Sequence, residues 1–190
     1  MKGNKIIFFA AAVFASLIIL ADVLFIVDER EYAIIMQFGE AKKAIKEPGL
    51  KFKVPFIQSV VRYDNRLLSY DVPEIEVTAA DSKRININLL TRYVIQDPIV
   101  FYKRIGNSVR AKERLAQIVP GAMRRVIGRS HLSDLFSEKR LKITEEIHKD
   151  VKEVAANFGL AVRDVRIVAA EFPQENQEAI FRRMKTQQVQ

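Results

Sequence analysis

The chain has 190 residues, a formal net charge of +8 and no cysteine, which excludes disulfide bonds, thiolate catalysis and cysteine-ligated zinc. Its two histidines, His131 and His148, are too far apart in sequence for a local metal-binding pair, so no metal or other cofactor is expected. The basic residues alternate with acids, as in Lys139 to Glu153, which is typical of a solvated helix face. This pattern argues against a nucleic-acid partner and favours attraction of the basic surface to anionic lipid headgroups.

The most distinctive stretch is Ile6 to Val27, an apolar run that only Asp22 interrupts. At roughly 1.5 Å per residue, a helix of about 22 residues spans about 33 Å, enough to cross the roughly 30 Å hydrocarbon core of a bilayer. A cleaved signal peptide is disfavoured because a cut after Ala15 would leave a strongly apolar terminus. Lysines precede the run and acids follow it, so residues 1–5 are expected in the cytoplasm and the domain after Val27 on the outer side of the membrane.

Two features beside this predicted helix leave alternatives open. Asp22 either lies in water near the outer interface or contacts a polar group on a partner's membrane helix. Phe56 and Ile57, preceded by lysines, either form an apolar tip at the membrane interface or pack in the core. The membrane-interface candidates are therefore Asp22, Lys51, Phe52, Lys53, Phe56 and Ile57.

The segment after the helix has β patterning. Residues 31–38 predict a strand that is apolar on both faces, and residues 40–47 a charged connection. In residues 50–54 leucine, phenylalanine and valine alternate with two lysines, which predicts a short strand with a basic outer face. Residues 60–97 read as successive strands without intervening helices, which favours an antiparallel sheet.

The pattern then changes to helical spacing. Residues 109–126 predict a helix that Pro120 should kink or interrupt. Ser137 and Glu138 are typical of a helix start, and residues 143–158 have the spacing of an amphipathic helix. Residues 160–168 predict a returning strand. The expected fold is thus α+β, with a β-rich part over 28–97 and an α/β part over 98–172.

Residue types that hydrolases use for catalysis are close together in sequence at only one point, which contains Ser130, His131, Ser133 and Asp134. Neighbours in sequence rarely reach the geometry of a catalytic triad, and no G-x-S-x-G motif is present. The seven glycines are scattered singly, so no phosphate-binding loop is predicted. We therefore expect a binding or scaffold protein without catalytic residues.

Two segments carry a resemblance to a known family. Residues 29–72, which include PGLKFKVPF, and residues 162–184, VRDVRIVAAEFPQENQEAIFRRM, resemble the SPFH (band 7, stomatin and prohibitin-like) proteins, most of all the HflC branch. The resemblance covers nearly the whole chain. It implies an N-terminal transmembrane helix followed by an SPFH domain, mainly an antiparallel sheet first and then an α/β part.

The resemblance also implies a function. Proteins of the HflC branch are single-pass proteins of the bacterial inner membrane with a periplasmic SPFH domain. They form self- or hetero-oligomers, the latter with an HflK-like paralogue. These complexes enclose an FtsH-like ATP-dependent membrane protease and limit its degradation of membrane proteins. The alternative is a stomatin-like organiser of membrane lipids into microdomains that acts independently of the protease.

Family members continue into a long coiled-coil helix, so residues 173–190 are expected to be the start of such a helix. Either the gene product is truncated at this point or the sequence is a fragment. By the same resemblance, the subunit-interface candidates are Phe172, Pro173, Ile180, Phe181, Arg182, Arg183 and Met184.

Overall fold

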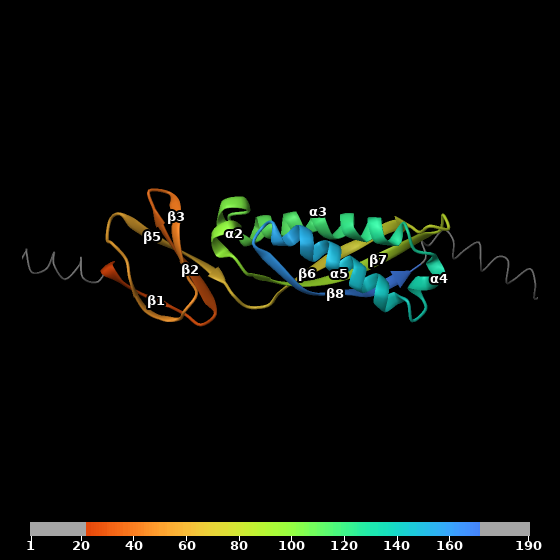
Figure 1. Cartoon of the computed structure of the whole chain (residues 1–190), viewed down its shortest axis with the longest axis horizontal. Helices are drawn as coiled ribbons and strands as arrows, with labels where there is room; N and C mark the ends of the chain where they lie inside the picture. Colours follow the sequence, from red (N-terminus) through yellow and green to blue (C-terminus); the bar gives the residue numbers. More distant parts are fainter. Residues whose placement is uncertain (1–21, 172–190) are drawn as a thin grey trace, which may run out of the picture. The chain divides into compact units, whose positions relative to one another are not determined.

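The computed structural model describes residues 22–171, which divide into two compact units (Figure 1). Unit 1 includes the described residues up to Arg66 together with 97–103, and unit 2 includes 67–96 and the described residues from Arg104 onward. The subunit-interface candidates from Phe172 to Met184 lie outside the described residues.

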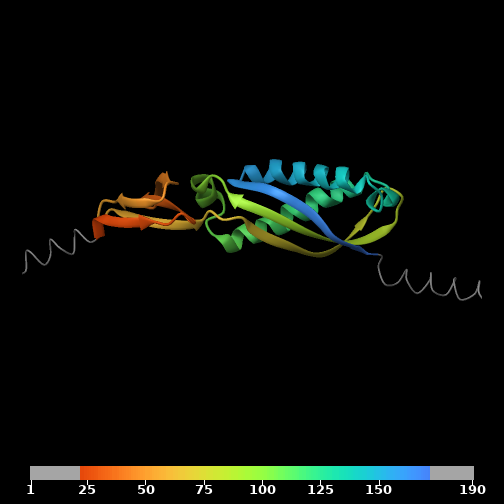
Figure 2. The ribbon, with the colours of Figure 1, turned by 90° about the horizontal axis from the view of Figure 1, so that it is seen from below.

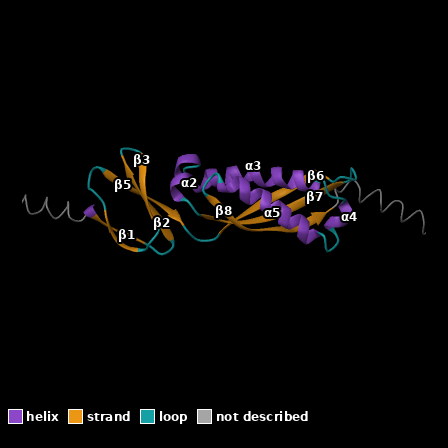
Figure 3. Ribbon diagram, viewed as in Figure 1, coloured by secondary structure: helices purple, strands orange, loops and turns teal. Residues whose placement is uncertain are grey.

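Unit 1 is built from short antiparallel strands, as predicted (Figure 3). A three-stranded sheet has the order β3-β2-β5, and a two-stranded sheet pairs β1 with β4. The elements are β1 (Leu24–Val27), β2 (Glu31–Gln37), β3 (Glu40–Ile45), β4 (Gly49–Phe52), β5 (Gln58–Asp64) and most of α2 (Pro98–Arg104).

The core of unit 1 forms where the two sheets face each other. Phe25 and Val27 of β1 pack with Ala33 and Ile35 of β2 in one buried cluster. The strand predicted to be apolar on both faces is β2, and its residues 33–36 are all buried, so both faces are covered.

The first turn of α2 adds an aromatic contact to this unit. The rings of Phe101 and Tyr63 meet edge to face, with centroids 5.1 Å apart and an interplanar angle of 81°. Burial raises the pKa of the Tyr63 phenol, with a smaller contribution from Tyr102.

Two predictions for unit 1 were wrong in detail. The charged connection at 40–47 contains β3, because the central strand β2 requires a partner on each side and an exposed edge strand tolerates lysines. The apolar run predicted as one helix to Val27 changes to strand at Leu24, because β1 pairs with β4 and buries Phe25 and Val27. Residues 6–21 lie outside the described residues, and within 22–171 no helix is both long and apolar enough to span a bilayer.

Unit 2 is a three-stranded antiparallel sheet with helices on one face (Figure 2). The strand order is β6-β7-β8, so β6 and β7 belong with the C-terminal strand and not with unit 1, in contrast to the predicted boundary at residue 97. The elements are β6 (Leu68–Thr78), β7 (Arg84–Ile95), α3 (Ser108–Ile127), α4 (Leu132–Leu135), α5 (Arg140–Ala156) and β8 (Leu160–Glu171).

Helix α3 packs against β6 and α5, and α5 packs against β8. In the central strand β7, alternate residues from Ile85 to Ile95 are buried. Helix α3 continues through the buried Pro120, so the predicted alternative of an interruption at this residue was wrong. The proline removes one backbone hydrogen bond, but burial of apolar neighbours such as Val119 and Met123 offsets that loss.

The predicted start of α5 was two residues early. Helix α5 begins at Arg140, and the Ser137 hydroxyl accepts a hydrogen bond from the Lys139 backbone N–H at 3.3 Å instead of capping a helix that begins there. The helix ends at Ala156, and Gly159 has a φ of +74°, which explains the glycine at this turn. The returning strand predicted at 160–168 is confirmed and continues to Glu171.

Candidate membrane-docking surface

Strand β4 exposes its apolar side chains and turns its lysines toward the protein, which is the reverse of the prediction. Phe52 is 70% exposed and Leu50 is exposed with it. The side chains of Lys51 and Lys53 are only 27% and 17% exposed. The alternation therefore exists, but its apolar face is the outer one.

The register of the β1–β4 pair extends this apolar face across both strands. Leu24 lies opposite Phe52, and Ile26 lies opposite Leu50. All four side chains are exposed, because the alternate residues Phe25 and Val27 fill the core. Directly opposed residues in an antiparallel pair have neighbouring side chains, so the four form one continuous apolar patch.

Ion pairs hold the lysines in their inward orientation. Lys53 Nζ lies 2.7 Å from Asp22 Oδ1, and Lys51 Nζ lies 3.6 Å from Glu47 Oε2. The backbone N–H of Lys53 also donates to the Val23 carbonyl at 2.8 Å. Asp22 therefore has an intramolecular partner, which neither sequence-based alternative included. Because Lys51 and Lys53 have carboxylate partners, these two residues are less available to anionic lipids than the sequence suggested.

A tight turn after β4 presents Phe56 to solvent. The Ile57 N–H donates to the Pro55 carbonyl at 2.8 Å, which makes Phe56 the centre of a three-residue turn with φ = +65°. The Val54 N–H donates to the Gln58 side chain at 2.8 Å, and the Gln58 N–H donates to the Val54 carbonyl at 3.0 Å. Phe56 is 85% exposed, so the sequence-based alternative of core packing was wrong for this residue.

Phe38 is a second exposed aromatic residue in a left-handed conformation, and the sequence analysis missed it. It has φ = +51° in the β2–β3 turn, is followed by Gly39 at +82°, and is 83% exposed. Gln37 pairs with Gln58, so Phe38 lies beside the turn that contains Phe56. Asparagine or aspartate is the usual first residue of such a turn, and the Phe-Gly pair was the available signal.

These side chains define one surface, here called the apolar surface. Its strand residues come from the β1–β4 pair, and its turn residues lie beside the β2–β5 pair (Figure 1). Its members are Leu24, Ile26, Phe38, Leu50, Phe52, Val54, Phe56 and Ile57. Contiguous exposed apolar patches mark protein or membrane contacts.

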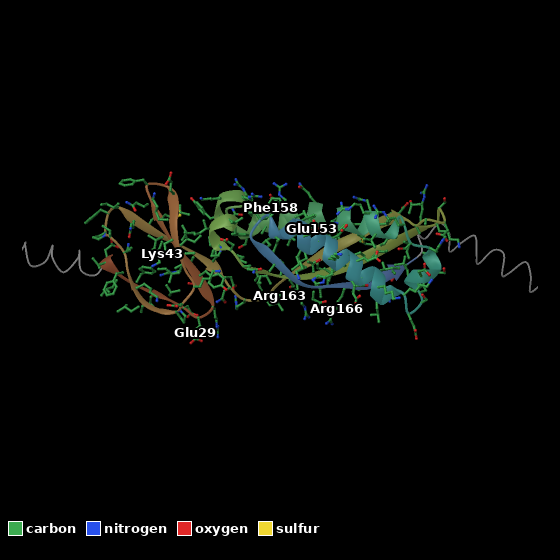
Figure 4. The ribbon with its side chains drawn as sticks, in the orientation of Figure 1. Glu29, Lys43, Glu153, Phe158, Arg163 and Arg166 are labelled. Carbon is green, nitrogen blue, oxygen red and sulfur yellow. The ribbon has the colours of Figure 1, made fainter. Side chains whose placement is uncertain are left out.

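Two charged residues of unit 1 lie on elements other than β1 and β4. Lys43 is on β3, and Glu29 is in the turn between β1 and β2 (Figure 4). The Glu29 carbonyl accepts a hydrogen bond of 2.7 Å from the Asn65 side chain, which ties this turn to the end of β5. The apolar surface is thus held by a folded unit and not by a loose loop.

The hydrolytic residue types in unit 2 are engaged in local structure. The Ser130 hydroxyl donates to the Val126 carbonyl at 3.1 Å, and His131 is the residue before α4. Asp134 accepts a hydrogen bond from Lys139 Nζ at 2.9 Å, which lowers the pKa of the aspartate. The contacts of these residues are those of helix ends and turns.

Comparison with known proteins gives a family match and several relatives. Residues 25–190 match the SPFH domain / Band 7 family. A stomatin homologue of Pyrococcus horikoshii is 30% identical over 171 residues, covering 90% of this chain and 62% of its own length. The HflC protein of Buchnera aphidicola is 27% identical over 206 residues, covering 97% of this chain and 66% of its own length. Stomatin-1 of Caenorhabditis elegans is 27% identical over 155 residues, covering 82% of this chain and 46% of its own length. The chain therefore spans less than two thirds of the length of these relatives.

Proposed function

Because the chain belongs to the SPFH domain / Band 7 family, we propose that it is a membrane-attached scaffold protein whose unit 1 docks on the bilayer through the apolar surface. The observation that carries this proposal is the orientation of β4, which exposes Phe52 and ion-pairs Lys53. A soluble fold would gain stability by the opposite orientation, since each buried phenylalanine contributes about 1.5–3 kcal/mol.

The location of the apolar surface supports a bilayer as its partner. The surface begins at Leu24, within the last residues of the apolar run from Ile6 to Val27 that was predicted to span the membrane. A unit joined to the bilayer at this point would have the exposed side chains of β1 and β4 near the headgroups. The predicted orientation, with the N-terminus in the cytoplasm and the SPFH domain in the periplasm, remains part of the proposal.

The apolar character of the surface specifies how it would dock. Phenylalanine and isoleucine side chains transfer favourably into the boundary between headgroups and acyl chains. Lys51 and Lys53 each have a carboxylate partner in the protein, so attraction to anionic lipids would be a minor contribution from these residues.

We further propose that the chain assembles with an HflK-like paralogue and restrains an FtsH-like membrane protease, without peptidase activity of its own. The similarity to HflC of Buchnera aphidicola supports this choice. The residues from Phe172 to Met184 are proposed as contacts between subunits. The similarity to stomatins supports the second candidate, an organiser of membrane lipids that acts without a protease.

Cysteine accessibility tests the docking proposal, since the natural chain contains no cysteine. In native membranes, a membrane-impermeant maleimide should label Val109→Cys, at an exposed position on α3, from the periplasmic side. Phe56→Cys should react only after detergent is added. Equal labelling of both positions in intact membranes would refute docking, and labelling of Val109→Cys from the cytoplasmic side would refute the orientation.

Co-purification in mild detergent tests the partners. Recovery of both an HflK-like protein and an FtsH-like protease supports the protease scaffold. If neither accompanies the chain, and deletion changes lipid fractions without changing turnover of protease substrates, the lipid-organising function replaces it.

A further inference from the structure

A small hollow of unit 2 lies beside the start of α3 and is here called the α3 hollow. It has a volume of about 250 Å³, which is below the usual range of about 300–1,000 Å³ for pockets that bind drug-sized molecules. A ligand of this hollow is therefore small. All its lining residues belong to unit 2, and most of them come from the first half of α3. They are Arg104, Ile105, Arg110, Glu113, Arg114 and Gln117.

Two helices contribute arginines to the α3 hollow. Arg104 is the last residue of α2, and the link to α3 contains Gly106 at φ = +91°, a conformation that glycine adopts without strain. Arg110 and Arg114 are four residues apart in α3, so their side chains project from the same face of the helix. Three guanidinium groups thus line one small volume.

The positive charge of these arginines is not neutralised by ion pairs within the described chain. No carboxylate of residues 22–171 lies within ion-pair distance of Arg104, Arg110 or Arg114. Glu113 is the one acidic residue among those that line the α3 hollow, so the lining side chains have a formal charge of +2. Like charges at a spacing of four residues destabilise a helix, and an anion bound between them would remove this repulsion.

Two larger hollows of the protein lack this excess of positive charge. One in unit 1 has a lining with a formal charge of −1 and contains the ion pair between Asp64 and Arg66. One in unit 2 has a neutral lining and contains the ion pair between Asp164 and Arg166. An anion would have to displace a carboxylate from the paired arginine in either of them. Of these three hollows, the α3 hollow is therefore the one suited to an anion.

Contacts within the protein position Arg114 before any ligand binds. Its guanidinium carbon lies 5.0 Å from the centroid of the Phe158 ring, which follows α5 (Figure 4). Its Nη1 donates a hydrogen bond of 3.1 Å to Gln117 Oε1. A guanidinium group has five N–H donors, so donors remain for a ligand. Because the side chain loses less freedom on binding, this arrangement favours affinity.

We infer that the α3 hollow binds a phosphate monoester group, with Arg110 and Arg114 as bidentate donors and Arg104 as the third cation. A phosphate monoester has a charge of about −1.5 to −2 at pH 7, which matches the charge of the lining side chains. A carboxylate, or the phosphodiester of a lipid such as phosphatidylglycerol, has only a single negative charge. Guanidinium groups also match the geometry of phosphate oxygens.

The inference rests on the guanidinium groups and not on the end of the helix. The Asn107 side chain already caps α3, since its Oδ1 accepts the Arg110 backbone N–H at 2.9 Å. Two sources have the required chemistry, a soluble phosphate ester and the headgroup of phosphatidic acid. The site goes beyond the proposed scaffold function and depends on residues of unit 2 alone.

Titration calorimetry with inorganic phosphate tests the site in residues 1–190 purified in a neutral detergent. At mildly alkaline pH we expect saturable binding, and binding weaker by about tenfold or more in the double variant Arg110→Gln with Arg114→Gln. The matched control, Arg129→Gln with Arg163→Gln, removes the same charge at two exposed arginines outside the hollow and should bind as the natural chain does. No saturable binding by the natural chain, or equal loss in both double variants, would overturn the inference.

The variant Arg114→Lys separates geometry from charge. Lysine keeps the positive charge but lacks the planar fork, so the affinity for phosphate should fall several-fold. The circular dichroism spectrum should not change, because Arg114 is exposed. An affinity equal to that of the natural chain would overturn the assignment of Arg114 as a bidentate donor.

Lipid nanodiscs distinguish the two sources of the phosphate group. The natural chain is placed in phosphatidylcholine discs that contain either phosphatidic acid or phosphatidylglycerol, and inorganic phosphate is titrated. If phosphatidic acid alone prevents phosphate binding, the ligand is a lipid headgroup, and equal binding in both discs assigns a soluble ester. Loss of binding in both discs would overturn the choice of a monoester. Protection of Phe56→Cys in membranes does not depend on this site, so its failure is distinguishable from failure of docking.

Discussion

Replacing two aromatic residues of the apolar surface should separate docking from folding. Phe52 and Phe56 are 70% and 85% exposed, so serine at both positions should change the free energy of unfolding by less than about 0.5 kcal/mol per site. A fully transferred phenylalanine contributes about 1.5–3 kcal/mol, and scaling by the exposed fractions gives about 2–5 kcal/mol for the pair. The equilibrium ratio of docked to undocked unit 1 should therefore fall by about 30- to 3,000-fold.

The chain lacks tryptophan, so a single Phe38→Trp substitution can report docking. In vesicles, brominated lipids should quench this tryptophan in the otherwise unchanged chain and much less in the Phe52→Ser, Phe56→Ser background. The matched control is Phe136→Ser, at an exposed phenylalanine of unit 2, which should leave quenching unchanged. Equal quenching in the doubly substituted and control backgrounds, with thermal unfolding unaltered, would refute the reasoning.

Three further predictions concern stability. Phe38→Asn should raise the free energy of unfolding by about 0.5–1 kcal/mol in thermal or denaturant unfolding, because asparagine adopts the positive φ of this turn more readily; a decrease would contradict this account of the turn. Thr91→Val should stabilise unit 2 by about 1 kcal/mol, because the fully buried Thr91 hydroxyl has no hydrogen-bond partner within the described chain; destabilisation would indicate a partner. Arg66 donates hydrogen bonds to Asp64 and lowers the pKa of that carboxyl in the folded protein below its ordinary value of 3.8. The pair therefore stabilises the fold fully at pH values above 3.8. This stabilisation is lost as the pH falls through the pKa of Asp64 in the folded protein. Arg66→Gln should therefore lower the melting temperature at pH 7 and have a smaller effect in strong acid, and an equal effect at both would argue against the linkage.

The strands and helices follow from local patterns more closely than their orientations do. Alternation in 50–54 predicted a strand, but alternation does not specify which face is buried. The orientation depends on pairing with β1 and on the ion pair between Asp22 and Lys53, 31 residues apart. Because β1 was predicted to be helix, neither contact was available from the local pattern.

The sequence predicted only some residues of the apolar surface, because the others depend on contacts between distant segments. Phe52, Phe56 and Ile57 were identified from apolar residues near lysines, whereas Leu24, Ile26 and Phe38 became members only through strand pairing and a left-handed turn. Similarly, the long-range pairing of β7 with β8 determines the boundary between the units. Local composition contains no information about such a pairing.

The central claim is that the turn containing Phe56 lies in the bilayer. The most direct measurement is the depth of a single tryptophan at this position, from quenching by lipids brominated at different acyl carbons in vesicles that contain the Phe56→Trp variant of residues 1–190. We expect strong quenching by shallow bromines and protection from aqueous iodide, whereas a tryptophan at the exposed Val109 should show the opposite. Full access of iodide to the tryptophan at position 56 in sealed vesicles would contradict the account.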